Sequence, residues 1–218
     1  ERTMRWFKEK YESDLVTDIM DIQILAPCKD RGDASVFNLN LDVQEYVNPH
    51  SPDKNEIKVS VSKDKYYYLR EGDKIMCIKN NYKICGQNKK GVFNGWCGIL
   101  KEIDTWTGFH KVYIPMIDDT MVFSTSDLTN GVVLGYASTV HKYQGSSAKV
   151  IIGAFDNTTP PDMRTKELIY TLWTRAEKDC TTVAQNTALY SAALNSGISD
   201  KNTFLVELLD KDLNCEIA

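Results

Sequence analysis

A polar stretch at Tyr136–Ile152, with the sequence YASTVHKYQGSSAKVII, carries side chains suited to binding phosphate. It is rich in Thr, His, Lys and Gln and runs into an apolar segment typical of a buried strand. Such side chains donate hydrogen bonds to phosphate oxygens, and the glycine at position 145 lets the backbone approach a ligand closely. The segment therefore indicates a polyanion site beside a strand.

A second segment, Leu168–Ala176 with the sequence LIYTLWTRA, is an apolar helix pattern that ends in Thr174-Arg175. An arginine held at the end of a rigid element can stabilise the negative charge on a phosphoryl group during transfer. The two segments together point to chemistry on a nucleoside triphosphate or a nucleic-acid backbone.

The chain lacks other groups that phosphate and metal chemistry would need. No G-x-x-x-x-G-K-[ST] sequence occurs, so no loop cradles the β- and γ-phosphates. Asp118 and Asp119 follow an apolar run, but their place among β-type segments favours a hairpin turn over a Mg²⁺ site. The six cysteines form no C-x-x-C pair, and there are three histidines, so we expect no metal site.

Composition and charge narrow the class of protein. No apolar run approaches the length of a membrane span, and no signal peptide is evident, so we expect a soluble, cytoplasmic protein with free thiols. The net charge is −4, yet residues 54–101 hold 11 basic and 4 acidic residues, a local charge of +7. A basic middle in an acidic chain is compatible either with a polyanion-binding surface or with solubilising lysines on exposed strands.

The residue pattern predicts an α/β domain interrupted by an all-β insertion. Residues 1–53 and 131–218 form the first, and residues 54–130 the second, which we expect to be a small barrel with no helix. In the α/β part we expect helices at 2–12, 36–48, 165–175, 186–196 and 202–209, and strands at 21–26, 149–154 and 180–184. In the insertion we expect strands at 58–61, 74–79, 98–104, 111–116 and 121–124, and an aromatic strand at 66–68.

Four segments resemble motifs of one helicase family, in the family's order. TVHKYQGS is similar to motif V of superfamily 1 helicases, IYTLWTRAEK to motif VI, and ILAPCKDRG…LNLDVQEYVNP to the RecD-like pattern around motif IV. REGDKIMCIKNNY and GVFNGWCGIL resemble the SH3-type barrel that RecD-like helicases carry between motifs IV and V. The chain thus resembles the C-terminal half of a RecD-like (exodeoxyribonuclease V alpha-subunit-like) superfamily 1 DNA helicase.

This resemblance implies a second RecA-like, P-loop-type motor domain interrupted by an SH3-like barrel. It implies ATP-driven 5′→3′ translocation on single-stranded DNA by a longer protein that uses ATP and Mg²⁺. This segment alone would bind neither, because it lacks both Walker motifs. The implied partners are single-stranded DNA and an N-terminal RecA-like domain of the same chain, with subunits of a nuclease complex as further candidates and no membrane.

The resemblance also implies roles for single residues. Arg175 matches the motif VI arginine finger, and Gln144 and Gly145 match residues lining the nucleotide cleft. Lys29 or Arg31 matches a basic residue near motif IV, expected among the nucleotide contacts, and the choice between the two stays open. The remaining matches are expected to contact DNA or to shape a face over the DNA track: Thr139, His141, Lys142, Asn80, Asn81, Phe93 and Asn94.

Two positions depart from the family pattern. Tyr143 stands where motif V usually has Ser, and Ser147 where it has Glu, which puts nucleotide discrimination in doubt. The alternative to a motor segment is a non-catalytic module that binds nucleic acid or protein. A phosphate-binding loop upstream of this segment would distinguish the motor from the binding module.

Overall fold

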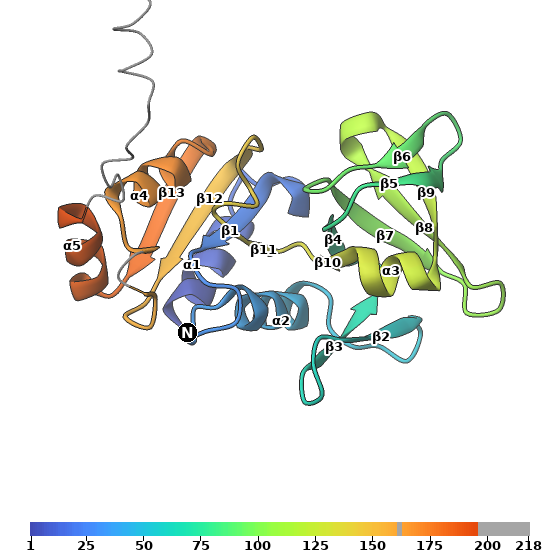
Figure 1. Cartoon of the computed structure of the whole chain (residues 1–218), viewed down its shortest axis with the longest axis horizontal. Helices are drawn as coiled ribbons and strands as arrows, with labels where there is room; N and C mark the ends of the chain where they lie inside the picture. Colours follow the sequence, from blue (N-terminus) through green and yellow to red (C-terminus); the bar gives the residue numbers. More distant parts are fainter. Residues whose placement is uncertain (161–162, 196–218) are drawn as a thin grey trace, which may run out of the picture.

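The structure is a computed structural model that describes residues 1–160 and 163–195. Two sheets lie side by side, joined by short connections, and a separate hairpin lies below them in the view of Figure 1. The helices are α1 (Arg2–Tyr11), α2 (Val36–Val47), α3 (Thr125–Gly131), α4 (Lys166–Trp173) and α5 (Asn186–Leu194), with short 3-10 helices η1 (Ile19–Asp21) and η2 (Pro115–Ile117). The strands are β1 (Ile22–Ala26), β2 (Glu56–Ser60), β3 (Tyr66–Arg70), β4 (Lys74–Cys77), β5 (Asn81–Cys85), β6 (Lys90–Val92), β7 (Cys97–Ile103), β8 (Phe109–Ile114), β9 (Asp119–Ser124), β10 (Val132–Leu134), β11 (Ala137–Thr139), β12 (Ala148–Phe155) and β13 (Ala176–Ala184).

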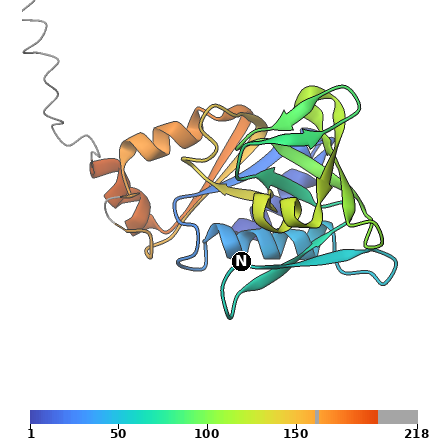
Figure 2. The same ribbon diagram turned by 45° about the vertical axis from the view of Figure 1, so that its right-hand side comes forward.

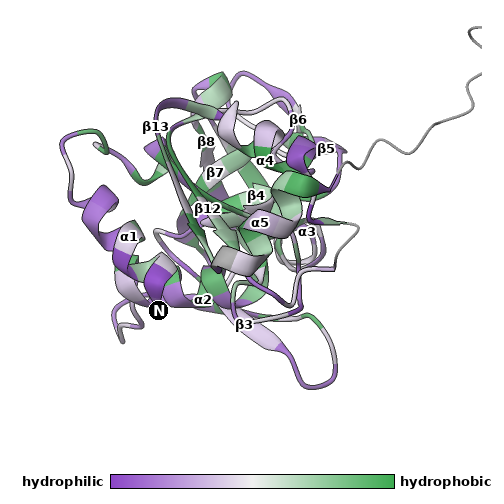
Figure 3. Cartoon of the chain, turned by 90° about the vertical axis from the view of Figure 1, so that its left-hand side faces the viewer, coloured by the Kyte–Doolittle hydropathy of each residue, from purple (hydrophilic) through white to green (hydrophobic). Residues whose placement is uncertain are grey.

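The first sheet is parallel, with the strand order β11-β1-β12-β13. Helices cover both of its faces, so alternate residues of one strand are buried on opposite sides. Ile22 and Ile24 pack with Phe7 of α1 and Val43 of α2, whereas Leu25 packs on the α4 side. Figure 3 shows the hydrophobic β12 behind α4 and α5, and a largely hydrophilic α1. The prediction of buried, parallel-type strands is confirmed.

Helix α4 carries the predicted arginine to the sheet. Thr165 caps its N-terminus, with its hydroxyl accepting from the backbone N–H of Leu168 at 3.2 Å. Leu168, Ile169 and Leu172 are buried against β12 and β13. The helix ends at Trp173, and the chain then enters β13 at Ala176, four residues before the expected start of that strand. Arg175 therefore lies in the tight turn between two packed elements.

The second sheet contains seven strands in the order β10-β4-β7-β8-β9-β5-β6, with antiparallel neighbours. It curls around buried side chains that include Leu100, Val112 and Phe123. The hairpin β2–β3 is a separate two-stranded sheet (cyan in Figure 2) that lies alongside α2. In β3 the exposed Tyr66 and Tyr68 alternate with the buried Tyr67 and Leu69, so the prediction of a half-buried aromatic strand is confirmed.

The expectation of an insertion without helices is wrong. Thr125–Gly131 forms α3, whose N-cap Ser124 accepts from the N–H of Asp127 while the Asp127 carboxylate accepts from Ser124. This capping box, with Leu128 turned into the core, stabilises a short helix that has little apolar periodicity. The antiparallel sheet also continues through β10, which pairs with β4 beyond the expected limit at residue 130. The helix expected at 202–209 lies outside the described residues.

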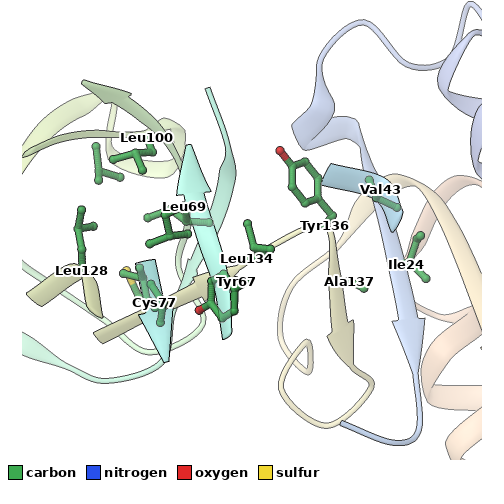
Figure 4. Close-up of a cluster of buried hydrophobic side chains, with 14 of the residues drawn as sticks. Ile24, Val43, Tyr67, Leu69, Cys77, Leu100, Leu128, Leu134, Tyr136 and Ala137 are labelled. Carbon is green, nitrogen blue, oxygen red and sulfur yellow. The ribbon is translucent and has the colours of Figure 1, made fainter. Parts of the chain in front are cut away.

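One continuous hydrophobic core joins the two sheets (Figure 4), and hydrogen-bonded polar side chains also cross their junction. Asp73, fully buried in the β3–β4 turn, accepts hydrogen bonds from Gln44 at 2.5 Å, Asn48 at 2.7 Å and Tyr136 at 2.9 Å. The backbone N–H of Arg70 donates to the same carboxylate at 2.7 Å. Burial raises the pKa of Asp73, and these hydrogen bonds act against that rise. Asp73 therefore ties the barrel to α2 and to the strand that leads into β11.

We expect Asp73→Ala to lower the free energy of unfolding by about 3 kcal/mol or more, because it leaves several buried donors without an acceptor. Urea unfolding followed by tryptophan fluorescence measures the change. Asp64→Ala, at an exposed position in the β2–β3 turn, is the control and should change the free energy by less than about 0.5 kcal/mol. Equal, small losses in the two variants would show that the junction does not depend on this carboxylate.

Candidate functional site: two edges of the parallel sheet

Arg175 lies at the edge of the parallel sheet where β12 and β13 begin. Its backbone carbonyl accepts from the N–H of Ala148 at 3.1 Å, which joins the starts of the two strands. Its guanidinium donates to the carbonyls of Thr171 at 3.3 Å and Ser146 at 3.4 Å, and to the hydroxyl of Thr174 at 3.2 Å. These partners are neutral, so the guanidinium charge is not neutralised by them.

Gln144 and Gly145 lie in the turn that leads to this same edge. Both are exposed, and Gly145 has a φ of +87°, a conformation that favours glycine. No heavy atom of the described residues lies within 4 Å of the position where a Cβ at 145 would be, so this face of the turn is open. The structure thus brings Gln144, Gly145 and Arg175 to one edge.

The structure accounts for the two departures from the motif V pattern. Tyr143 is buried, and its hydroxyl donates to the carbonyl of Ser147 at 3.0 Å while its N–H donates to the carbonyl of Thr139 at 3.2 Å. Burial raises the pKa of Tyr143, so the hydroxyl stays protonated as a donor. Ser147 donates to the carboxylate of Glu177 in β13, so an acidic side chain contacts position 147, where the family has its own acidic residue. Sequence reasoning did not select Glu177, because nothing in the motif marks it.

The opposite edge, where the parallel strands end, holds a groove of about 400 Å³. Lys29 and Arg31 line it from the loop after β1, and Thr139 and His141 line it from the end of β11 and the turn that follows. Open α/β sheets bind ligands in crevices at this carboxyl edge. The 8 residues of β12 place the two ends of that strand roughly 25 Å apart at about 3.3 Å per residue. The turn after β11 spans part of this distance, since the N–H of Gln144 donates to the carbonyl of His141 at 3.4 Å.

Lys29 and Arg31 lie at this carboxyl edge and not beside Arg175, and their contact with the nucleotide stays a prediction. They were predicted among the nucleotide contacts, yet the structure groups them with Thr139 and His141 and not with Arg175. The reason is topological: a loop that follows a parallel strand lies at its carboxyl edge, whereas the turn that holds Arg175 precedes one.

Lys142 lies beside this groove. Its N–H donates to the hydroxyl of Thr139 at 3.3 Å, and partial burial together with the nearby charge of Lys29 lowers the pKa of its side chain. In the part of the chain that the structure describes, neither lysine forms an ion pair with a carboxylate. Two neighbouring cations without an ion-pair partner among the described residues are an arrangement that a bound phosphate would stabilise.

Of the predicted barrel residues, Phe93 and Asn94 lie in a turn near Lys142, whereas Asn80 and Asn81 have structural roles. Asn80 accepts from the N–H of Asn94 at 2.8 Å, and Asn81 donates to Asp127 at 2.8 Å. A Cβ built on Gly95, which follows Asn94, would lie 3.9 Å from the carbonyl oxygen of Lys142. The turn that contains Asn94 and Gly95 therefore adjoins the motif V segment.

An exposed aromatic group extends from the same turn. Phe93 contacts Tyr82 edge-on at 5.7 Å between ring centroids and lies 4.9 Å from Trp96. Tyr82 is 64% exposed and Phe93 38%. Sequence reasoning selected Phe93 and missed Tyr82 and Trp96, because β5, with the sequence NYKIC, carries only one aromatic residue and gives no pattern that marks it.

The two acidic residues once considered for Mg²⁺ are part of a turn. Asp118 adopts a left-handed conformation at the end of η2, between β8 and β9. Asp119 accepts from the backbone N–H groups of Gln87, Asn88 and Lys89, and these bonds lower its pKa against the effect of burial. The hairpin-turn interpretation is confirmed.

Two further observations concern metal and membrane. Within residues 1–160 and 163–195, no group of three or more His, Cys, Asp or Glu side chains is arranged to hold a metal ion. None of the helices in this described part is both long and apolar enough to cross a bilayer.

Two family models match the chain over separate parts. Residues 39–114 match the SH3 domain of ATP-dependent RecD-like DNA helicases, and residues 134–183 match the UvrD-like helicase C-terminal domain. The first covers α2 and the strands through β8, and the second covers the segments that hold Gln144 and Arg175. The two matches follow one another in the order expected from the motifs.

Similar proteins agree with these matches. The ATP-dependent RecD2 DNA helicase of Deinococcus radiodurans is 26% identical over 186 residues, which cover 85% of this chain and 23% of the relative. An uncharacterised protein of Methanocaldococcus jannaschii is 28% identical over 177 residues, covering 72% of this chain and 14% of the relative. The chain thus spans less than a quarter of the length of either relative.

Solved structures support the fold. Bacteroides Pif1 bound to single-stranded DNA gives a TM-score of 0.53 at 16% identity, over 89% of this chain and 46% of that one. Bacteroides Pif1 with ADP-AlF3 and single-stranded DNA gives 0.54 at 16% identity, over 95% and 49%. Residues 39–114 therefore match the SH3 domain of RecD-like DNA helicases, residues 134–183 match the UvrD-like helicase C-terminal domain, and the fold is similar to that of the Pif1 structures.

Proposed function

We propose that the chain is the second motor domain of an ATP-dependent DNA helicase. Single-stranded DNA lies along the carboxyl edge of the parallel sheet, and Arg175 at the other edge faces ATP held by an N-terminal RecA-like domain of a longer protein. The observation that carries this proposal is that Lys29 and Arg31 lie with Thr139 at the carboxyl edge of the parallel sheet, whereas Arg175 lies at the edge where β12 and β13 begin.

The DNA track is assigned to Lys29, Arg31, Thr139, His141 and Lys142. Phosphate contacts by lysine and arginine supply most of the sequence-independent affinity for single strands, and the barrel extends the track with exposed aromatic rings that stack on bases. The Deinococcus relative is named a DNA helicase, and both Pif1 structures contain single-stranded DNA, which supports this choice of ligand.

Arg175 is assigned the arginine-finger role. Its guanidinium is held at the sheet edge by neutral carbonyl and hydroxyl acceptors and can exchange these for γ-phosphate oxygens. The longer protein would supply the phosphate loop, the Mg²⁺ carboxylate and the water-orienting group. One relative is named ATP-dependent, and one Pif1 structure contains ADP-AlF3.

The residues between Thr139 and Ala148 connect the two edges. Tyr143 links the two ends of this segment by hydrogen bonds. Its backbone N–H donates to the carbonyl of Thr139, and its hydroxyl donates to the carbonyl of Ser147. A shift of the nucleotide edge on ATP binding would therefore move the track directly. Repeated closure and opening would advance the protein along DNA, in the 5′→3′ direction that the RecD-like resemblance implies.

The proposal keeps the predicted division into a motor domain (1–53 and 131–218) and an SH3-like barrel (54–130), except that β10 (Val132–Leu134) is assigned to the barrel sheet. Its setting is the cytoplasm, where subunits of a nuclease complex are further candidate partners of the longer protein.

ATP hydrolysis, measured with and without oligo(dT), tests the proposal on this chain and on the longer protein. We expect DNA-stimulated turnover by the longer protein only. If the longer protein does not respond to DNA, the segment is a binding module and not a motor.

A further inference from the structure

An apolar slot of about 100 Å³ opens beside the DNA track, where the barrel meets the parallel sheet. Phe37 and Leu41 of α2, Val61 and Tyr67 of the hairpin, and Met76 and Val133 of the barrel line it. It shares Lys29, Asp30 and Thr139 with the groove at the carboxyl edge. The slot and the groove therefore adjoin, so a group that belongs to a DNA strand in the groove can enter the slot.

The slot contains a buried polar group that the fold does not use. Tyr67 is 6% exposed, and among the described residues its hydroxyl has no hydrogen-bond partner. Burial and the charge of Asp73 raise the pKa of Tyr67 to about 12, so the hydroxyl is a donor at neutral pH. The other large polar lining residue, Asn40, is satisfied by Val36 and Ala137. Figure 4 shows Tyr67 beside Leu134, which also lines the slot.

Cations surround the slot. Lys29 and Lys142 line it on the side of the track, and the Lys65 ammonium lies 5.3 Å from the centroid of the Phe37 ring. An apolar interior with one free hydroxyl and a cationic rim matches a flat, weakly polar ring that carries phosphate. A nucleotide has this chemistry, whereas an aliphatic or cationic side chain of a protein partner does not.

We propose that this slot receives a pyrimidine base of the bound single strand, with the Tyr67 hydroxyl donating to a base carbonyl oxygen. Lys29 and Lys142 then contact the flanking phosphates. The slot's volume of about 100 Å³ is of the same order as the roughly 150 Å³ cavity that takes up benzene in an engineered protein, so it leaves room for at most one ring and excludes the two fused rings of a purine. The proposal rests on the proposed function, because the strand must first lie in the groove.

The test measures fluorescence anisotropy of labelled oligo(dT) and oligo(dA) with the whole chain. Val61→Phe narrows the slot from a partly exposed position and leaves every lysine in place. Val122→Phe is the matched control, since both valines are 41% exposed and Val122 lies on the outer face of β9. We expect wild type and Val122→Phe to prefer oligo(dT) by about tenfold, and Val61→Phe to bind both oligonucleotides equally.

A second variant and a second ligand complete the test. Tyr67→Phe keeps the ring and should weaken oligo(dT) binding about fivefold without changing oligo(dA) binding. Thymidine monophosphate should not compete at millimolar concentration if the strand is the source of the base. The slot assignment is overturned if Val61→Phe retains the wild-type preference, or if the monophosphate binds while oligo(dT) shows no preference. If wild type binds neither oligonucleotide, the proposed function fails together with the slot.

Discussion

Replacing Arg175 with alanine in the longer helicase should lower ATP turnover by about 10³-fold or more while ATP still binds. The guanidinium lies at the edge of the sheet with only neutral acceptors, so its charge is available to the transferring phosphoryl group. It contributes when the two motor domains close and not when ATP first binds. Single-turnover hydrolysis measures the first effect, and titration with a fluorescent ATP analogue measures the second.

Two further variants make this result specific. Arg175→Lys keeps the charge but loses the planar, multidentate donor group, so we expect it to recover only a small part of the rate. Lys178→Ala removes a neighbouring exposed cation from β13 and should leave turnover within about twofold of wild type. Near-normal turnover by Arg175→Ala would exclude it as the finger.

The double variant Lys29→Ala, Lys142→Ala should weaken binding of single-stranded DNA by roughly ten- to a hundredfold. The two side chains lie close enough for the charge of Lys29 to lower the pKa of Lys142, and no carboxylate among the described residues pairs with either. Losing two phosphate contacts should reduce the slope of log K against log salt by about 1.4, at about 0.7 per contact. Anisotropy titrations over a range of salt concentrations measure both quantities.

The control for this variant is Lys101→Ala, which removes an exposed lysine of β7 that lies 5.9 Å from the Tyr113 ring. It should change neither the affinity nor the slope. A double variant with an unchanged salt slope would mean that DNA does not pass along the carboxyl edge, even if the affinity falls for another reason.

Sequence motifs predicted most of the parallel sheet, because long apolar strands and a capped amphipathic helix are strong local signals. They did not show which motif residues lie together. The motif resemblance grouped Lys29 and Arg31 with Arg175 among the nucleotide contacts. Whether a residue precedes or follows its strand, however, decides at which edge of the sheet it lies. The expected strand at 21–26 already placed Lys29 after a strand, and the expected strand at 180–184 placed Arg175 before one. The separation of the two residues could therefore have been predicted from the sequence.

The barrel was harder to predict for physical reasons. Helix α3 is stabilised by the Ser124–Asp127 capping box and not by apolar periodicity, and β5 and β6 are short, lysine-rich strands held by long-range pairing. The slot around Tyr67 could not be predicted at all, since residues from α2, the hairpin, the barrel and β11 meet only in the folded chain.

The central claim is that the two edges of one sheet perform separate tasks, and separation of function tests it most directly. ATP turnover without DNA and DNA affinity without ATP would be measured in the longer protein for Arg175→Ala and for the Lys29, Lys142 double variant. We predict that the first variant loses turnover and keeps DNA affinity, and that the second keeps basal turnover and loses DNA affinity. If each variant lost both activities to the same extent, or if the two losses were exchanged, the assignment of nucleotide and DNA to opposite edges would be contradicted.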